Sequence, residues 1–265
     1  MEIGYELKTE KISVCNFTSS DVKKHIGDHC HDTYEITFFL QASGKYIVEG
    51  SEQRVESGKL LLINPMSYHK VSFDSTDEIE GYTIHFSRSI LTDAAAEVFD
   101  LFTSAKEGHG SFFSTEAVSD RLISVFDSFE FAVGLENIER FAYLQALLSE
   151  LIVLLSATGG ERITHTDEEL GARVCKYLNN NIEKNISLDR IARRFFVSKY
   201  HLCRAFKSYS GTSVHAYVNQ KRILYAKKLI ESGVTASVAA ERVGFGDYSA
   251  FYRAYVKIFG KSPTA

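Results

Sequence analysis

The chain has 265 residues, 45% of them hydrophobic, and a formal net charge of −4. This length predicts one or two domains, and this composition is ample for the buried cores of a globular protein. The charge is divided unevenly, because residues 166–265 carry 17 Lys and Arg against 8 Asp and Glu (+9), whereas residues 1–165 carry 13 against 26 (−13). The last hundred residues are therefore predicted to bind a polyanion such as nucleic acid.

Several features of the sequence speak against secretion or membrane insertion. The N-terminus, MEIGYELKTEK, is charged where a signal peptide needs an apolar core. The four cysteines form no CxxC pair. The most apolar segment, LLSELIVLLSA, is interrupted by Glu150 and is too short to span a bilayer. We therefore expect a cytoplasmic protein and exclude a membrane protein.

From Asp32 to about Phe86 the chain consists of short runs in which apolar and polar residues alternate. These runs are YEITFFL, KYIVEG, KLLLIN, HKVSF and GYTIHF, and glycines and an Asn-Pro pair separate them. This pattern predicts antiparallel strands of a small barrel or jelly roll.

Histidines and a glutamate gather around the first of these runs. His29, His31 and Glu35, together with His69, offer ligands suited to Zn, Fe, Mn or Ni. Alternatively, these side chains line the mouth of a pocket for a small organic effector. We expect this second possibility, because ligand pockets are frequent at barrel mouths and aromatic residues, Tyr34 among them, could form the pocket walls. The expected effector-binding residues are His29, His31, Glu35, Phe38, Tyr46, Tyr68, His69 and Tyr82; no metal or other cofactor is expected.

Residues 89–158 have a helical pattern. Leu144, Leu148, Leu151 and Leu155 follow the spacing of a heptad seam, which two copies of the chain could share. The alternative is a helix packed on its own barrel, and fewer than three heptads cannot discriminate between the two. Residues 159–169 begin with adjacent glycines, continue with mainly polar residues, and are predicted to be an interdomain linker.

The C-terminal part contains an internal repeat. The string R-A-aromatic, four residues, G-x-S begins at Arg204 and again at Arg253. A short helical stretch precedes each copy, with Ser187 as an expected N-cap in the first and Gly244 as an expected left-handed cap in the second. Each copy is therefore predicted to be a helix-turn-helix, which places its second helix in the DNA major groove.

The second helix of each copy has an apolar face and a polar face. Leu202, Phe206 and Tyr209 are predicted to point inward in the first, and Phe251, Tyr255 and Ile258 in the second. Each repeated arginine is then exposed and suited to guanine; the alternative, a solvated surface charge, is disfavoured by the repetition. The expected DNA-binding residues are Lys199, Tyr200, Cys203, Arg204, Lys207, Arg222, Tyr248, Ser249, Tyr252 and Arg253, with Arg222 expected on a phosphate.

These C-terminal motifs resemble the DNA-binding domain of the AraC/XylS transcriptional regulators over about residues 170–263. The resemblance rests on both helix-turn-helix stretches and on the strings GFGD and FGKSP, which occur in the family's order. It implies that one long helix, within SVHAYVNQKRILYAKKLIES, holds the two recognition helices for adjacent major grooves. Ala239 stands where the family usually has a larger aliphatic residue.

The N-terminal half resembles the cupin-like sensor domain that often accompanies such DNA-binding domains, through HCHDTYE and NPMSYH. The H-x-H-x3-E pattern with a distant histidine holds a metal in enzymatic cupins, although the glycine spacing here departs from that consensus. The resemblance implies an α+β chain, with a cupin-like β-barrel of jelly-roll type (1–88), a helical dimerisation segment (89–158), the linker and an all-α double helix-turn-helix domain (170–265).

The sequence thus predicts a sequence-specific, DNA-binding transcriptional regulator controlled by a small-molecule effector. Its expected partners are duplex DNA, the effector, a second copy of the chain, and RNA polymerase if it activates transcription. The alternative is a metal-dependent cupin enzyme with a DNA-binding regulatory tail. We expect no enzyme, because the sequence offers no nucleophile-and-base pair, phosphate loop or cofactor fingerprint.

Overall fold

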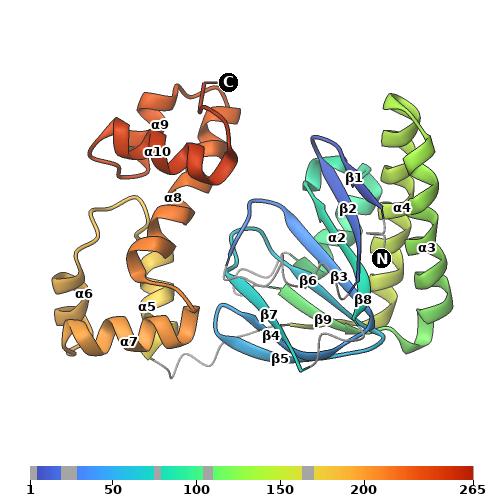
Figure 1. Ribbon diagram of the computed structural model, residues 1–265, viewed down its shortest axis with the longest axis horizontal. Helices are drawn as coiled ribbons and strands as arrows, with labels where there is room; N and C mark the ends of the chain where they lie inside the picture. Colours follow the sequence, from blue (N-terminus) through green and yellow to red (C-terminus); the bar gives the residue numbers. More distant parts are fainter. Residues whose placement is uncertain (1–4, 19–28, 75–78, 104–109, 163–169, 265) are drawn as a thin grey trace. The chain divides into compact units, whose positions relative to one another are not determined.

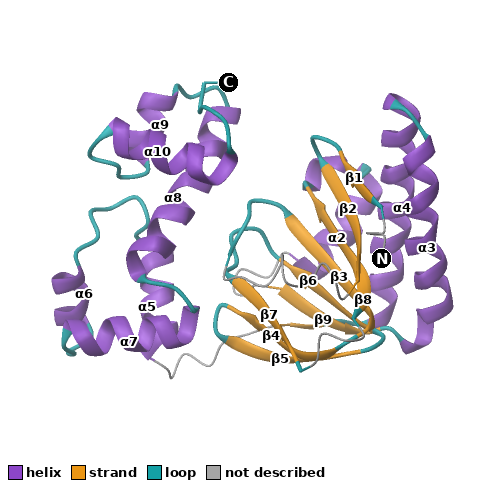
Figure 2. Ribbon diagram, viewed as in Figure 1, coloured by secondary structure: helices purple, strands orange, loops and turns teal. Residues whose placement is uncertain are grey.

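The computed structural model describes residues 5–18, 29–74, 79–103, 110–162 and 170–264. The chain divides into two compact units, Met1–Thr164 and His165–Ala265. Within the first unit, β-strands lie against helices, whereas the second unit is built from helices (Figures 1 and 2). The α+β fold class predicted from the sequence is confirmed.

The described strands of the first unit form two antiparallel sheets. The strands are β1 (Glu6–Lys8), β2 (Ile12–Thr18), β3 (Tyr34–Gln41), β4 (Ser43–Val48), β5 (Ser51–Glu56), β6 (Lys59–Ile63), β7 (His69–Phe73), β8 (Glu80–Phe86), β9 (Gly110–Ser114) and β10 (Glu161–Arg162). Among the described residues, the order is β1-β2-β8-β3-β6-β9-β10 in one sheet and β5-β4-β7 in the other. The predicted barrel is therefore a pair of jelly-roll-like sheets that do not close.

The larger sheet extends beyond the segment that the sequence assigned to it. Strand β9 lies in a stretch expected to be helical, yet it pairs with β6 along Lys59–Ile63. Strand β10 lies in the expected linker and pairs with β9. Both strands are short, and neither shows enough alternation for a sequence pattern to identify it.

Alternation along β3 separates two apolar cores. Ile36 and Phe38 point to one face and pack with residues of α3 and α4 in what we call the helix-side core. Phe39 points to the other face and packs with Tyr46 and Val48 of β4 in the inter-sheet core. The seven-stranded sheet is thus buried on both faces, which explains why YEITFFL and KLLLIN are nearly continuous apolar runs.

The helical elements of the first unit cover one face of this sheet (Figure 1). They are η1 (Arg88–Ile90), α2 (Asp93–Thr103), η2 (Glu116–Val118), α3 (Ser119–Phe131), η3 (Ala132–Gly134) and α4 (Asn137–Thr158). In α4, Leu144, Leu148, Leu151 and Leu155 are fully buried in the helix-side core. The spacing therefore marks a helix packed on its own unit, and the expectation of an intermolecular seam through these leucines is wrong.

Helix α4 is also longer than the apolar segment that we judged too short for a bilayer. Among the described residues, it has the length and composition of a membrane-crossing helix, with a mean hydropathy of 1.6. Core helices of globular domains share these properties, and the burial of the α4 leucines against the sheet explains its apolar composition.

Within residues 170–264, the helices repeat one motif on either side of a long helix. They are α5 (Leu170–Asn179), α6 (Leu188–Arg194), α7 (Lys199–Ser210), α8 (Val214–Glu231), α9 (Ala236–Arg242) and α10 (Tyr248–Phe259). The pairs α6–α7 and α9–α10 are the two helix-turn-helix units, and α8 joins them (Figure 1).

The repeated residues set the ends of the second helices. Ser198 and Asp247 are N-caps whose side chains accept from backbone N–H groups of α7 and α10, respectively. Gly211 (φ 76°) and Gly260 (φ 68°) end these helices in the left-handed region, where glycine avoids the strain of a Cβ. The predicted left-handed Gly244 is likewise confirmed, with φ 85°.

The inward faces largely follow the prediction. Leu202, Phe206, Phe251 and Tyr255 are buried. Ile258 is instead 38% exposed, and its neighbour Phe259 contacts the ring of Tyr255 with centroids 4.7 Å apart. The last turn of α10 therefore turns Phe259 inward rather than Ile258.

Candidate effector site and nucleic-acid interface

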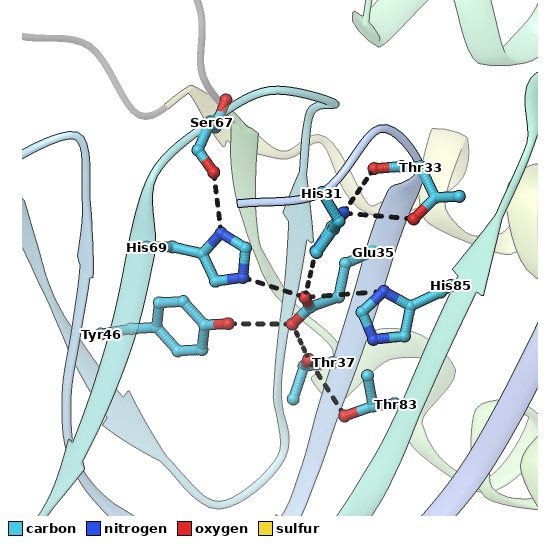
Figure 3. Close-up of polar contacts among 9 residues, drawn as sticks. All are labelled: His31, Thr33, Glu35, Thr37, Tyr46, Ser67, His69, Thr83 and His85. Atoms are coloured by element: carbon cyan, nitrogen blue, oxygen red, sulfur yellow. Dashed lines mark hydrogen bonds and ion pairs between the residues drawn. The ribbon is translucent and has the colours of Figure 1, made fainter. Parts of the chain in front are cut away.

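Glu35 lies where both sheets of the first unit contribute polar side chains (Figure 3). On the larger sheet, Glu35 of β3 stands directly opposite His85 of β8. On the smaller sheet, His69 begins β7 and forms a backbone bridge with His29, with N–H···O distances of 2.9 and 3.2 Å. Pairing thus gathers residues that are up to 56 positions apart in the sequence.

The two carboxylate oxygens of Glu35 have different surroundings. Oε1 accepts hydrogen bonds from the Tyr46 hydroxyl (2.9 Å) and the Thr37 hydroxyl (2.8 Å). Oε2 lies 2.9 Å from Nε2 of His31, 3.1 Å from Nε2 of His69 and 4.0 Å from Nδ1 of His85. Hydroxyl donors therefore hold one oxygen, and the other faces imidazole nitrogens.

Backbone carbonyls orient the two nearest imidazoles. Nδ1 of His31 lies 2.9 Å from the carbonyl oxygen of Thr33, and Nδ1 of His69 lies 2.9 Å from that of Ser67. Because a carbonyl oxygen accepts only, each Nδ1 carries the proton and each Nε2 is turned toward Glu35. Nε2 of His69 is buried and lies 3.1 Å from Oε2, but makes no hydrogen bond to a described residue.

The carboxylate is ionised and stabilised by its neighbours. Burial raises the pKa of Glu35, but the charge of His69 and the other imidazoles together hold this pKa well below its ordinary value. Burial lowers the pKa of His69, but the Glu35 carboxylate, together with the Ser67 carbonyl and Glu49, raises this pKa above its ordinary value. Burial, with the nearby histidines, lowers the pKa of His85 to about 4, so this ring is neutral near pH 7.

The residues at this site fit a divalent transition metal. His29, His31, Glu35 and His69 each offer one ligand atom, and these atoms all lie within 4.8 Å of one another. Imidazole nitrogens with a carboxylate oxygen suit Zn²⁺, Ni²⁺ or Fe²⁺. The Nδ1–carbonyl bonds are those that commonly orient metal-binding histidines. We call these four residues and His85 the Glu35 cluster.

Sequence reasoning missed His85. The alternation in GYTIHF places Thr83 and His85 on the face opposite to Tyr82 and Ile84, which was a usable signal. The strands that pair with β8 could not be identified from the sequence, because β8 lies between β2 and β3 and both pairings are distant in sequence. Only the register that sets His85 opposite Glu35 reveals its role.

Two predicted effector contacts lie on the wrong face of the sheet. Phe38 and Tyr82 both stack on Phe126 of α3, with ring centroids 5.0 Å apart in each pair. The Tyr82 hydroxyl donates to Asp127 of α3 at 2.9 Å. Both residues thus belong to the helix-side core, whereas the side chain of Glu35 points to the other face. The expectation that they form the walls of the effector pocket is therefore wrong, because alternate residues of a strand point to opposite faces of the sheet.

The other tyrosines predicted to line the effector site lie at different distances from the Glu35 cluster. Tyr46 contacts the cluster directly through its hydroxyl, and burial next to the Glu35 carboxylate raises its pKa well above the ordinary value. Tyr68 is buried next to His69 in the chain, and its backbone N–H donates to Oε1 of Glu49 at 2.8 Å. Tyr34 stacks on Phe86 in the helix-side core and is also not a wall of the site.

The second unit presents the predicted DNA-binding side chains of α7 and α10 to solvent. On α7, Cys203 is half-buried and the other four are exposed; on α10 all four are exposed. The exposed residues are Lys199, Tyr200, Arg204 and Lys207 on α7, and Tyr248, Ser249, Tyr252 and Arg253 on α10. Each set lies opposite its helix's buried residues, which leaves both faces available to a partner.

Arg222 requires a correction. This residue of α8 is buried, and its guanidinium donates to the carbonyl oxygens of Ile182 (2.8 Å), Lys184 (2.6 Å) and Gly244 (2.9 Å). A guanidinium used in this way does not present its donors to a DNA phosphate. Arg222 instead connects the long helix to the loop before α6 and to the turn between α9 and α10.

Comparison with known proteins agrees with this two-part organisation. Residues 12–170 match the family model of the AraC-like ligand binding domain, and residues 191–265 match that of a helix-turn-helix domain. The chain is 28% identical over 227 residues to the uncharacterized HTH-type transcriptional regulator YbfI of Bacillus subtilis, covering 84% of this chain and 80% of that one. It is 24% identical over 241 residues to the HTH-type transcriptional activator RhaS of Klebsiella pneumoniae, covering 89% and 85%. Among solved structures, ToxT from Vibrio cholerae O395 is 14% identical, with a TM-score of 0.40 and coverage of 96% and 95%.

Proposed function

The chain belongs to the AraC family of transcriptional regulators, and on this premise we propose that an effector bound at the Glu35 cluster changes how α7 and α10 bind DNA. The observation that carries the proposal is the repeated motif, because each copy puts an exposed arginine on the outward face of its second helix. The Glu35 cluster supplies the polar, buried recognition site that a ligand-binding unit requires.

The side chains of the two recognition helices divide into two roles. Arg204 and Arg253 occupy equivalent positions and are suited to bidentate contact with guanine in the major groove. Lys199 begins α7 and Lys207 lies in its last turn, where flexible ammonium groups suit phosphates. The exposed aromatic residues Tyr200, Tyr248 and Tyr252 add contact area beside the bases or sugars.

The first expected result concerns binding of the full-length protein to duplex DNA from its own promoter region. The logarithm of the affinity should fall linearly with the logarithm of the salt concentration, because lysine and arginine release condensed counterions from phosphates. Fluorescence anisotropy at several salt concentrations measures this slope. Lys207→Ala should reduce the slope by about one phosphate contact, whereas Lys59→Ala, in the sensing unit, should leave it unchanged. No binding to promoter DNA at low salt would contradict the proposal.

A dimer contact is proposed at the junction of α3 and α4. Phe131, Val133 and Ile138 are 63%, 47% and 80% exposed, and they lie within eight positions of one another. Neighbouring exposed apolar residues commonly mark an interaction surface. A second copy of the chain is the proposed occupant, because regulators that bind paired half-sites on DNA are often dimers.

Ile138→Glu is expected to weaken self-association at least about tenfold, because it places a charge in an apolar contact, a loss of about 1.4 kcal/mol or more. Sedimentation velocity over a concentration series measures the monomer–dimer equilibrium. Glu139→Gln, on the adjacent position of α4, is the matched control and should leave the equilibrium unchanged. If wild type and Ile138→Glu associated equally, this surface would not be the dimer contact.

A metal-dependent enzyme with a regulatory tail has weaker support. The relatives are named as transcriptional regulators and activators, which makes a non-enzyme the better proposal. We place the regulator in the cytoplasm with its DNA and propose a contact with RNA polymerase if it activates transcription.

A further inference from the structure

We propose that the effector recognised by the Glu35 cluster is a divalent transition-metal ion, held by His29, His31, His69 and Oε2 of Glu35. This inference rests on the proposed function, because it names the class of effector that the ligand-binding unit takes. It follows from the directions, the crowding and the chemistry of the cluster's own atoms.

The first argument is that ligand atoms are already aimed at one point. Nε2 of His31 and Nε2 of His69 both face Oε2 of Glu35, at 2.9 and 3.1 Å. Carbonyl groups of Thr33 and Ser67 fix both rings from behind through Nδ1. The backbone bridge between His29 and His69 brings the His29 ring close, with its centroid 4.4 Å from that of His69. Fixed rings lose little entropy when they bind an ion.

The second argument is the electrostatic demand of this arrangement. With each Nδ1 donating to a backbone carbonyl, the Nε2 atoms of His31 and His69 face Oε2 of Glu35, and this group of atoms requires positive charge on or between them. A proton can supply this positive charge between one nitrogen and the carboxylate oxygen at a time. One divalent cation supplies it for every ligand at once and satisfies the buried Nε2 of His69, which lacks a hydrogen bond to any described residue.

The third argument concerns which ions fit. Oε1 of Glu35 is held by the hydroxyls of Tyr46 and Thr37, which leaves Oε2 as the carboxylate's ligand atom. A set of imidazole nitrogens with one carboxylate oxygen suits Zn²⁺, Co²⁺, Ni²⁺ or Fe²⁺. Mg²⁺ and Ca²⁺ prefer six or more oxygen ligands. The cluster is therefore expected to discriminate against the abundant hard cations.

The fourth argument is that the expected walls for an organic effector lie elsewhere. Phe38 and Tyr82 pack in the helix-side core. On the side of Glu35, the neighbouring Phe39, Tyr46 and Val48 are buried in the inter-sheet core. The polar atoms that remain together are the nitrogens and the carboxylate of the cluster, whose ligand atoms span at most 4.8 Å. That spacing suits an ion.

A bound ion would also connect the two sheets. Glu35 belongs to the seven-stranded sheet, whereas His69 belongs to the three-stranded sheet. An ion ligated by both would add a link to the Tyr46–Glu35 hydrogen bond and the His69–Glu35 ion pair that already join the sheets, so binding should stabilise the sensing unit against unfolding. This gives the ion a physical means of changing the unit that binds it.

The test uses full-length protein stripped of metal with a chelator and then titrated with Co²⁺. We expect about one equivalent to bind per chain, with visible d–d absorption, and Zn²⁺ but not Mg²⁺ to displace it. The half-buried His29 and His31 carry the mutational test, because replacing the buried Glu35 or His69 could prevent folding. His29→Ala and His31→Ala should each weaken binding about a hundredfold or more, beyond the 10- to 100-fold typical of outer-shell partners. His215→Ala, which removes an exposed histidine of α8, is the matched control and should bind normally.

A second measurement tests the regulatory role and separates the two proposals. Affinity for promoter DNA, measured with and without Zn²⁺, should differ by about 5- to 150-fold, and His31→Ala should abolish the difference. Less than about a tenth of an equivalent of Co²⁺ bound by folded, DNA-binding protein would overturn the metal inference and leave the regulator standing. Stoichiometric binding without any change in DNA affinity would overturn the effector role. Failure to bind promoter DNA in either state would overturn the proposed function itself.

Discussion

Arg222→Ala is expected to lower the free energy of unfolding of the DNA-binding unit by about 3 kcal/mol or more, because it leaves buried carbonyl groups without donors and removes a packed side chain. The guanidinium donates to carbonyls of Ile182, Lys184 and Gly244. These carbonyls belong to the loop before α6 and to the turn before α10, so the substitution should also disturb the placement of both recognition helices relative to α8. Affinity for promoter DNA should fall together with stability.

Urea denaturation followed by circular dichroism measures the loss, since the chain has no tryptophan for fluorescence. Arg242→Ala, which removes an exposed arginine from the end of α9, is the matched control and should change stability by less than about 0.5 kcal/mol. Gly244→Ala provides an independent test of the same contact. Its Cβ would lie 2.8 Å from Nη2 of Arg222, at a backbone φ of +85° that a side chain rarely adopts. If Arg222→Ala were as stable as Arg242→Ala, the buried guanidinium would not have the structural role assigned to it.

Arg204→Ala and Arg253→Ala are expected to reduce affinity for the cognate operator by about 1–3 kcal/mol each and to relax base preference in different halves of the site. The reason is geometric, because each arginine lies on the exposed face of its own recognition helix, and adjacent major-groove segments lie about 34 Å apart along the DNA. Each arginine should therefore read one half of the operator and leave the other half unaffected.

Selection of binding sites from a random library with each variant measures this division directly. Lys207→Ala is the comparison for a phosphate contact, because it should weaken all sequences alike and leave base preference intact. Arg242→Ala should select the same sites as the wild type. If both recognition-helix variants weakened every sequence equally, the two arginines would be phosphate contacts and the proposed base readout would be wrong.

The second unit could be predicted closely from the sequence because its signals are local. Caps, left-handed glycines and apolar faces depend on residues a few positions apart, and the repeat presents them twice. Arg222 was misassigned because helical periodicity does not show which loops cover a helix. Its partners lie between 22 and 40 positions away in the chain.

The sensing unit was less predictable because its contacts are distant in sequence. Strand alternation separates two faces but does not say which face is which, so Phe38 and Tyr82 were placed on the side of Glu35. His85 entered the cluster only through the β3–β8 register. The spacing of the α4 leucines is compatible with an internal core as well as with a dimer seam. Only the packing of the folded unit shows that they belong to the core.

The pairing of β9 with β6 has a consequence for where the sensing unit can be cut. In a fragment ending at residue 88, the strand Lys59–Ile63 would lose its neighbour and become the exposed border of the sheet. Its sequence, KLLLI, is almost entirely apolar, and an unpaired apolar strand is a template for pairing with other chains. Such a fragment would therefore be prone to aggregate, whereas one that continues through Arg162 retains both protecting strands and the helices between them.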